Sequence, residues 1–73
     1  MNDSHVLLDV RGLRCPLVLI RARTALGGLP DGEPLIVLAT DREAPIDLAA
    51  LASDSGRAFT VDESAGEWRC TLA

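Results

Sequence analysis

Residues 5–29, HVLLDVRGLRCPLVLIRARTALGGL, decide the fold of this chain. The aliphatic run of residues 5–10 predicts a strand, because such side chains fit a half-buried pleated surface. The glycine within residues 11–14 can adopt a positive φ, so this segment predicts a tight turn. Pro16 suits the first position of a helix, where its missing N–H costs nothing. We therefore predict a helix over residues 17–26, stopped by the glycine pair that follows it.

The rest of the chain continues the alternation of strands and helices. Residues 33–39 predict a strand that is apolar on both faces, which is typical of a central strand covered on both sides. Residues 44–55 predict a second helix. Residues 57–63 and 67–72 predict two short strands, joined by a hairpin at residues 64–66. The order β-α-β-α-β-β predicts a two-layer α/β sandwich with a mixed four-stranded sheet and both helices on one face.

The composition predicts one folded domain over residues 1–73, with 48% hydrophobic and 25% charged residues. Its core is thin, since a domain of about 60 residues buries only about 60% of the surface that its unfolded chain exposes. The net charge of −4 at pH 7 argues against direct binding of nucleic acid, which needs a basic surface. All seven basic residues are Arg, so the chain has no lysine for Schiff-base chemistry.

The sequence also gives expectations about location and redox state. It contains no apolar run of the length that a membrane span needs. Its first five residues lack the basic start and the apolar stretch of a signal peptide. We therefore expect a cytoplasmic protein without membrane contact, in which Cys15 and Cys70 are reduced.

The predicted topology brings two loops to one edge of the sheet. Sites in parallel β-α-β units form beyond the carboxyl ends of the strands. If the first two strands are neighbours, the turn with Gly12, Leu13, Arg14, Cys15 and Pro16 faces Asp41 and Arg42. The candidate site is therefore an open sheet edge.

Cys15 stands where the N-cap of the first helix is predicted. The unpaired N–H groups and the dipole of a helix start stabilise a thiolate, so we expect a lowered pKa for the Cys15 thiol. Arg14 and Arg11 are expected to act in the same direction, and all these groups would also hold an anionic persulfide. The alternative is an inert structural cysteine, because free Cys is among the most buried residue types.

The other candidate residues are less suited to catalysis or metal binding. Cys70 shares a predicted strand face with Trp68 and Leu72, which indicates a core position. His5, the only histidine, lies at the wrong end of the first strand to pair with Cys15. One His and two separated Cys do not make a zinc set.

Charged and apolar side chains near the two helix starts allow two interpretations each. Asp41 and Asp47 could form a carboxylate pair, but we favour charges that stabilise the start of the second helix. Leu17 and Ile20 fall on the outer side of the first helix, opposite the core side that includes Val18. They could form a docking patch near the cysteine, although isolated exposed aliphatic residues are common.

Leu8-Asp9 followed by Gly12-Leu13-Arg14-Cys15-Pro16 resembles the signature of the TusA/SirA-like sulfur carrier family. Three further segments are similar to that family, so the resemblance covers essentially the whole chain: Gly32-Glu33, Ala39-Thr40-Asp41 and Asp47-Leu48. The family motif usually has a second proline where this chain has Val18. Since a helix start tolerates proline without requiring it, this difference bears on local rigidity and choice of partner.

The resemblance implies a persulfide relay through Cys15, without a cofactor or a metal. A donor protein, such as a cysteine desulfurase or a rhodanese-like enzyme, would load the sulfur, and an acceptor protein would remove it. The family serves pathways such as tRNA thiolation and sulfur oxidation. We expect a sulfurtransferase-type carrier in which Gly12, Leu13, Arg14, Pro16 and Asp41 bind partners.

Two alternatives to this relay remain at the level of sequence. One is a non-catalytic protein-interaction module of the same fold, which predicts a buried or unreactive Cys15. The other is a thiol redox protein that uses Cys15 and Cys70, which requires Cα atoms within about 7 Å of each other.

Overall fold

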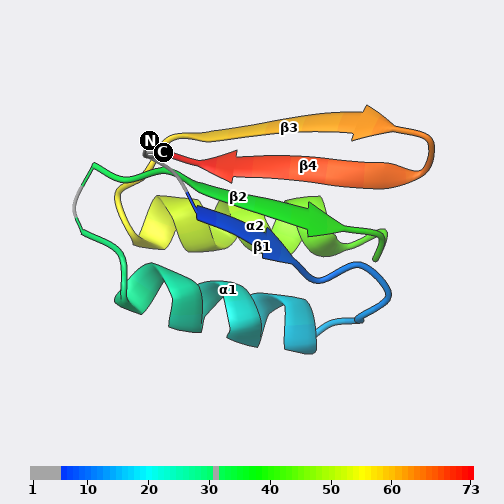
Figure 1. Ribbon diagram of the computed structural model, residues 1–73, viewed down its shortest axis with the longest axis horizontal. Coiled ribbons are helices and arrows are strands. Elements are labelled where there is room, and N and C mark those ends of the chain that lie inside the picture. The colour runs from blue at the N-terminus through cyan, green and yellow to red at the C-terminus, as the bar shows by residue number, and fades with distance from the viewer. Residues whose placement is uncertain (1–5, 31) are drawn as a thin grey trace.

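The computed structural model describes residues 6–30 and 32–73, so the predicted role of His5 lies outside the described residues. The order of elements is β-α-β-α-β-β, as predicted: β1 (Val6–Asp9), α1 (Leu17–Gly27), β2 (Leu35–Ala39), α2 (Ala44–Asp54), β3 (Phe59–Ser64) and β4 (Glu67–Leu72). Both helices lie on the same side of one sheet (Figure 1). The predicted two-layer α/β sandwich is therefore confirmed.

The sheet is mixed and has the strand order β1-β2-β4-β3. β1 and β2 are parallel, with Asp9 opposite Leu38, whereas β4 is antiparallel to both of its neighbours. The parallel pair follows from the crossover through α1, which returns the chain to its starting edge before β2 begins. Because β1 and β2 are neighbours, the loops that follow them leave the sheet at the same edge.

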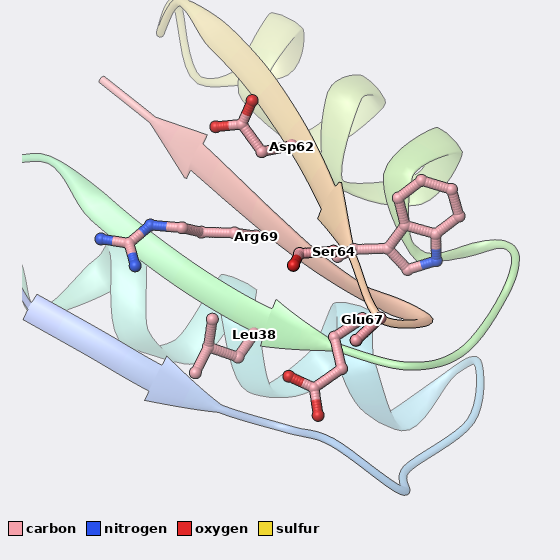
Figure 2. Close-up of a pocket in the computed structure, with 7 residues that line it drawn as sticks. Leu38, Asp62, Ser64, Glu67 and Arg69 are labelled. Carbon is pink, nitrogen blue, oxygen red and sulfur yellow. The ribbon is translucent and has the colours of Figure 1, made fainter.

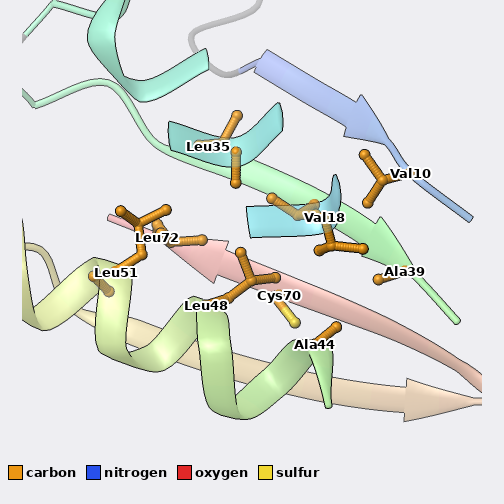
Figure 3. Close-up of a cluster of buried hydrophobic side chains, with 12 residues drawn as sticks. Val10, Val18, Leu35, Ala39, Ala44, Leu48, Leu51, Cys70 and Leu72 are labelled. Atoms are coloured by element: carbon orange, nitrogen blue, oxygen red, sulfur yellow. The ribbon is translucent and has the colours of Figure 1, made fainter. Parts of the chain in front are cut away.

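The core lies between the sheet and the two helices (Figure 3). Each helix buries one stripe: Val18 and Ala22 from α1, and Leu48, Leu51 and Ala52 from α2 are among its buried residues. The sheet contributes alternate residues, because successive side chains in a strand point to opposite faces. The buried members from the sheet and its edges are Val10, Leu35, Val37, Ala39, Cys70 and Leu72.

The central position of β2 is confirmed, but the prediction that it is covered on both sides is wrong. Both helices pack on one face. Ile36 and Leu38 alternate with the core residues Leu35, Val37 and Ala39, so their side chains point to the other face. Ile36 is nevertheless only 8% exposed. The register places Leu7 and Thr71 beside it, and such cross-strand neighbours shield one another. The apolar residues on the open face of β2 are therefore shielded by side chains of the flanking strands β1 and β4, and no second layer of helices is needed.

α2 ends one residue earlier than predicted, and β3 begins two residues later. The reason is a cap at the end of α2, in which Gly56 has a φ of +71°. The N–H of Arg57 donates to the carbonyl of Ala52 (2.8 Å), and the N–H of Gly56 donates to that of Ser53 (3.2 Å). This is the hydrogen-bond pattern of a Schellman motif. Arg57 therefore belongs to the helix cap and not to the strand.

The predicted hairpin between β3 and β4 turns through Ala65 (φ +54°) and Gly66 (φ +80°). Positive φ at both central residues is the requirement of a type I′ turn, for which Asn is much better suited than Ala. We expect Ala65→Asn to raise the free energy of unfolding by up to about 1 kcal/mol, the strain of an L-residue in this region. Urea unfolding measures the change. Ala58→Asn, outside the turn, is the control, and a lower stability of Ala65→Asn would contradict the turn assignment.

Candidate functional site

The candidate site forms where the loops after β1 and β2 meet. The N–H of Gly12 donates to Oγ1 of Thr40 (2.9 Å), and the N–H of Cys15 donates to Oδ2 of Asp41 (2.9 Å). Gly12 adopts a φ of +86°, which explains why this tight turn uses glycine. The structure thus brings together the two loops that the sequence placed at one sheet edge.

An open hollow of about 530 Å³ lies between these loops. Its lining includes most of the residues to which the sequence assigned partner binding, together with their neighbours in the second loop: Gly12, Leu13, Arg14, Thr40, Asp41, Arg42 and Glu43. The hollow is open to solvent. It therefore suits the approach of another macromolecule better than enclosure of a small substrate.

Cys15 is exposed, directly before the first helix. The predicted cap is wrong by one residue: Pro16 is the N-cap, and α1 begins at Leu17. The carbonyl of Pro16 accepts the first helical hydrogen bond, from the N–H of Ile20 (3.0 Å). Cys15 therefore lies outside the helix, directly before the N-cap, and its N–H donates to the side chain of Asp41.

Two carboxylates from α2 approach the thiol. Glu43 is the N-cap of α2, and Asp47 lies in its first turn. Sγ of Cys15 and one carboxylate oxygen from each of these residues lie within 4.8 Å of one another. Oδ2 of Asp47 is buried and has no hydrogen-bond partner among the described residues. The immediate surroundings of the sulfur are therefore acidic.

These acidic surroundings shift the pKa of the Cys15 thiol in the direction opposite to the predicted one. The pKa of the Cys15 thiol is raised, first by its hydrogen bond to the side chain of Asp47, then by partial desolvation, and then by the charges of Asp47, Glu43 and Asp41. Arg11, which we expected to lower it, pairs instead with Asp9 (2.7 Å). The prediction of a lowered pKa is therefore wrong, because the charges nearest in sequence are not the nearest in space.

Arg11 links two strand ends beside the site. Its guanidinium also contacts Glu67 of β4 (3.3 Å), and its backbone N–H donates to Oδ1 of Asp9 (3.1 Å). Hydrogen bonds from Arg11 lower the pKa of Asp9 to about 2. Both groups are exposed, so the contribution of this network to stability is small. Its consequence for the site is that Arg11 is engaged away from Cys15.

Sequence reasoning missed Glu43 and undervalued Asp47. The two residues are four positions apart, which places side chains on the same face of a helix turn. Since Asp41 was already predicted to face Cys15, the start of the helix that follows it had to lie near the sulfur as well. That combination of topology and spacing was the available signal.

The trio of Cys15, Glu43 and Asp47 also offers three metal-ligating atoms, one sulfur and two carboxylate oxygens, within 4.8 Å of one another. A structural zinc site closes with four ligands, usually of cysteine and histidine. Three donors, two of them carboxylates, do not make such a set. The absence of a metal and of a cofactor stays a prediction.

Cys70 is fully buried in the core beside Leu48 and Leu72 (Figure 3), as predicted. Burial raises the pKa of its thiol to about 11. Both cysteines are free, one exposed and one buried. Because Cys70 is buried, a redox partner cannot reach it, which argues against the alternative of a thiol redox protein.

Exposed aliphatic side chains lie on both helices near the site. Leu17 and Ile20 are 44% and 48% exposed, which confirms their predicted outer position. Ile46, in the first turn of α2, is 71% exposed, and the sequence did not single it out. Val18, at the place of the family's second proline, is fully buried, so it serves the core.

A second hollow, of about 410 Å³, lies on the face of the sheet that the helices leave open. Figure 2 shows Leu38, Arg69 and Asp62 projecting from neighbouring strands of this face. The register places them in one row across the sheet, with opposite charges of Arg69 and Asp62 side by side. The residues that line this hollow include neither Cys15 nor Cys70.

Comparisons with known proteins agree with this arrangement. The family model of sulfurtransferase TusA matches residues 6–73. The sulfur carrier protein TusA of Allochromatium vinosum is 35% identical over 66 residues, which are 90% of this chain and 87% of that protein. A Neisseria meningitidis serogroup A protein is 49% identical over 49 residues, which are 67% of this chain and 66% of that protein, just under two thirds of its length.

A solved structure supports the fold independently. The crystal structure of a SirA-like protein from Desulfitobacterium hafniense superposes with a TM-score of 0.83 at 25% identity, over 92% of this chain and 93% of that chain. Among the described helices, none has the length and apolar character needed to cross a bilayer. The matched family model, the Allochromatium relative and the shared fold together show that the chain belongs to the sulfurtransferase TusA family, as the Gly12–Pro16 segment predicted.

Proposed function

We propose that this protein is a cytoplasmic sulfur carrier that holds sulfur as a persulfide on Cys15. The observation that carries the proposal is the placement of Cys15: an exposed thiol beside an open hollow, with its backbone fixed by Asp41 (2.9 Å). A small carrier needs a nucleophile that another protein can reach and little else. The buried Cys70 does not offer this access.

The relay consists of two exchanges that balance without an external oxidant. In the first, the Cys15 thiol loses its proton, and the thiolate attacks the terminal sulfur of a donor persulfide, R–S–SH. The new bond joins Sγ of Cys15 to that sulfur. The S–S bond of the donor breaks, and its electron pair leaves with R–S⁻, which takes up a proton.

The second exchange runs the same chemistry in the other direction. A thiolate of the acceptor attacks the terminal sulfur of the Cys15 persulfide, and Cys15 leaves as a thiolate. Because both steps join macromolecules at one exposed atom, the surrounding surface must select partners. We assign this task to Gly12, Leu13, Arg14, Pro16 and Asp41, which flank the thiol.

The partners follow from the chemistry of the exchange. A cysteine desulfurase or a rhodanese-like enzyme presents a persulfide of the required kind, and an acceptor protein presents a thiol. Leu17, Ile20 and Ile46, all exposed on the two helices, supply apolar contact area beside the site. The whole of residues 1–73 acts as one carrier domain, and turnover belongs to the partner enzymes.

The proposal is tested by loading the reduced protein with polysulfide and recording its intact mass. We expect a gain of one sulfur atom that dithiothreitol reverses, with peptide mapping placing that atom on Cys15. A folded protein that gains no sulfur from an active donor would contradict the carrier function. It would favour a protein-interaction module with the fold of a carrier.

A further inference from the structure

Most of the charged groups around the Cys15 thiol are negative. Asp47 and Glu43 approach the sulfur from the start of α2, and Asp41 approaches from the preceding loop. Arg14 and Arg42 line the adjoining hollow. Among residues 6–30 and 32–73, both ion pairs belong to Arg11, so neither of these pairs neutralises a carboxylate at the sulfur.

Asp47 differs from the other two acids in its surroundings. Its Oδ2 atom is buried without a hydrogen-bond partner in the described part of the chain. Such an atom has lost its water without full compensation, which makes its charge act more strongly on nearby groups. Asp41, by contrast, uses Oδ2 to hold the backbone N–H of Cys15. Glu43 is exposed, so water screens its charge more than that of Asp47. Asp47 is therefore the acid whose carboxylate acts most strongly on the sulfur.

We propose that Asp47 is a positioning residue that keeps the empty carrier as a neutral thiol and disfavours the anionic persulfide of the loaded carrier. The proposal rests on the proposed function and deepens it. A persulfide is a stronger acid than its parent thiol, so at neutral pH the loaded form carries the charge that Asp47 repels. The carboxylate thus protects the empty carrier from stray electrophiles and shifts the equilibrium of transfer toward release of sulfur from the loaded one.

The first test is the pH dependence of Cys15 alkylation by iodoacetamide, with Asp47→Asn compared with wild type. Removal of the carboxylate is expected to move the midpoint of the profile to lower pH. If it moves by about one pH unit, the thiolate fraction at pH 7 rises about tenfold. Intrinsic nucleophilicity falls about threefold for the same change, so alkylation at pH 7 becomes about threefold faster, whereas the high-pH plateau becomes slower.

The pH profiles of wild type and Asp47→Asn are thus expected to cross. This crossing distinguishes an electrostatic effect of Asp47 on the thiol from a purely structural role. A variant that only disturbs the start of α2 would change the rate by a similar factor at every pH. Asp47→Glu, which keeps the charge, is expected to retain a profile close to that of wild type. Asp62→Asn, on the open sheet face, is the matched control and is expected to change nothing. An unchanged or raised midpoint in Asp47→Asn would overturn the proposal.

The second test uses the loaded protein. Wild type and Asp47→Asn are equilibrated with glutathione persulfide and glutathione, and the loaded fraction is read from intact mass. We expect Asp47→Asn to retain more sulfur, and an equal or smaller fraction would overturn the second half of the proposal. Alkylation needs no sulfur transfer. A shifted alkylation profile in a protein that never loads would therefore contradict the carrier function and leave the effect of Asp47 on the thiol established.

Discussion

Cys15→Ser is expected to abolish sulfur transfer and to leave the fold intact. A serine hydroxyl cannot form the Sγ–S bond of the persulfide, and Cys70 is too deeply buried to replace it. The backbone N–H that donates to Asp41 is kept, and an exposed side chain loses little packing. We therefore expect a change in the free energy of unfolding within about 0.5 kcal/mol.

The measurement is the transfer of radiolabelled sulfur from a cysteine desulfurase supplied with labelled cysteine. Label on Cys15→Ser is expected to fall to the background of a chain without an accessible thiol. Cys70→Ala is the matched variant, because it removes the other thiol and is expected to retain labelling. Label that survives in Cys15→Ser and disappears in Cys70→Ala would contradict the assignment of Cys15 as the residue that carries sulfur.

Leu48→Ala has the largest expected effect on stability. Leu48 is fully buried among the core residues between α2 and the sheet (Figure 3). Truncation of a buried leucine costs about 2–5 kcal/mol, since it removes transfer free energy and leaves a cavity. Small domains have only about 5–15 kcal/mol of total stability. In a chain of 73 residues, the variant is therefore expected to lose much of its resistance to urea.

Ile46→Ala is the control for this prediction. Ile46 lies in the same helix, two residues earlier, but is 71% exposed. Its truncation is expected to change the free energy of unfolding by no more than about 0.5 kcal/mol. Urea unfolding followed by circular dichroism compares the two variants. Equal destabilisation by Leu48→Ala and Ile46→Ala would contradict the placement of the core.

Most of the fold could be predicted from local patterns. The alternation of Trp68, Cys70 and Leu72 on one strand face predicted the buried cysteine, and the aliphatic run before Ala39 predicted a central strand. Element ends were harder because they depend on individual hydrogen bonds. The cap at the end of α2 is an example. It depends on a hydrogen bond from the N–H of Arg57 to the carbonyl of Ala52, which no periodic pattern in the sequence indicates.

The position of the candidate site was predicted correctly, but the sign of the charge around the Cys15 thiol was not. Topology alone placed the Cys15 loop opposite Asp41, because the carboxyl ends of parallel neighbours share an edge. The sign of the electrostatic effect required distances between side chains from separate elements. Arg11 is close in sequence but pairs with Asp9, whereas Asp47 is distant in sequence and contacts the sulfur. Sequence proximity was therefore a poor guide to which charges act on the thiol.

The proposed relay requires that Cys15 both receives sulfur and hands it on. It is tested most directly with protein that has been loaded with radiolabelled sulfur, freed of donor and mixed with cyanide, which accepts persulfide sulfur as thiocyanate. We expect one labelled thiocyanate for each loaded chain and the return of Cys15 to a free thiol. Label that remains on the chain, or that leaves from Cys70, would contradict it.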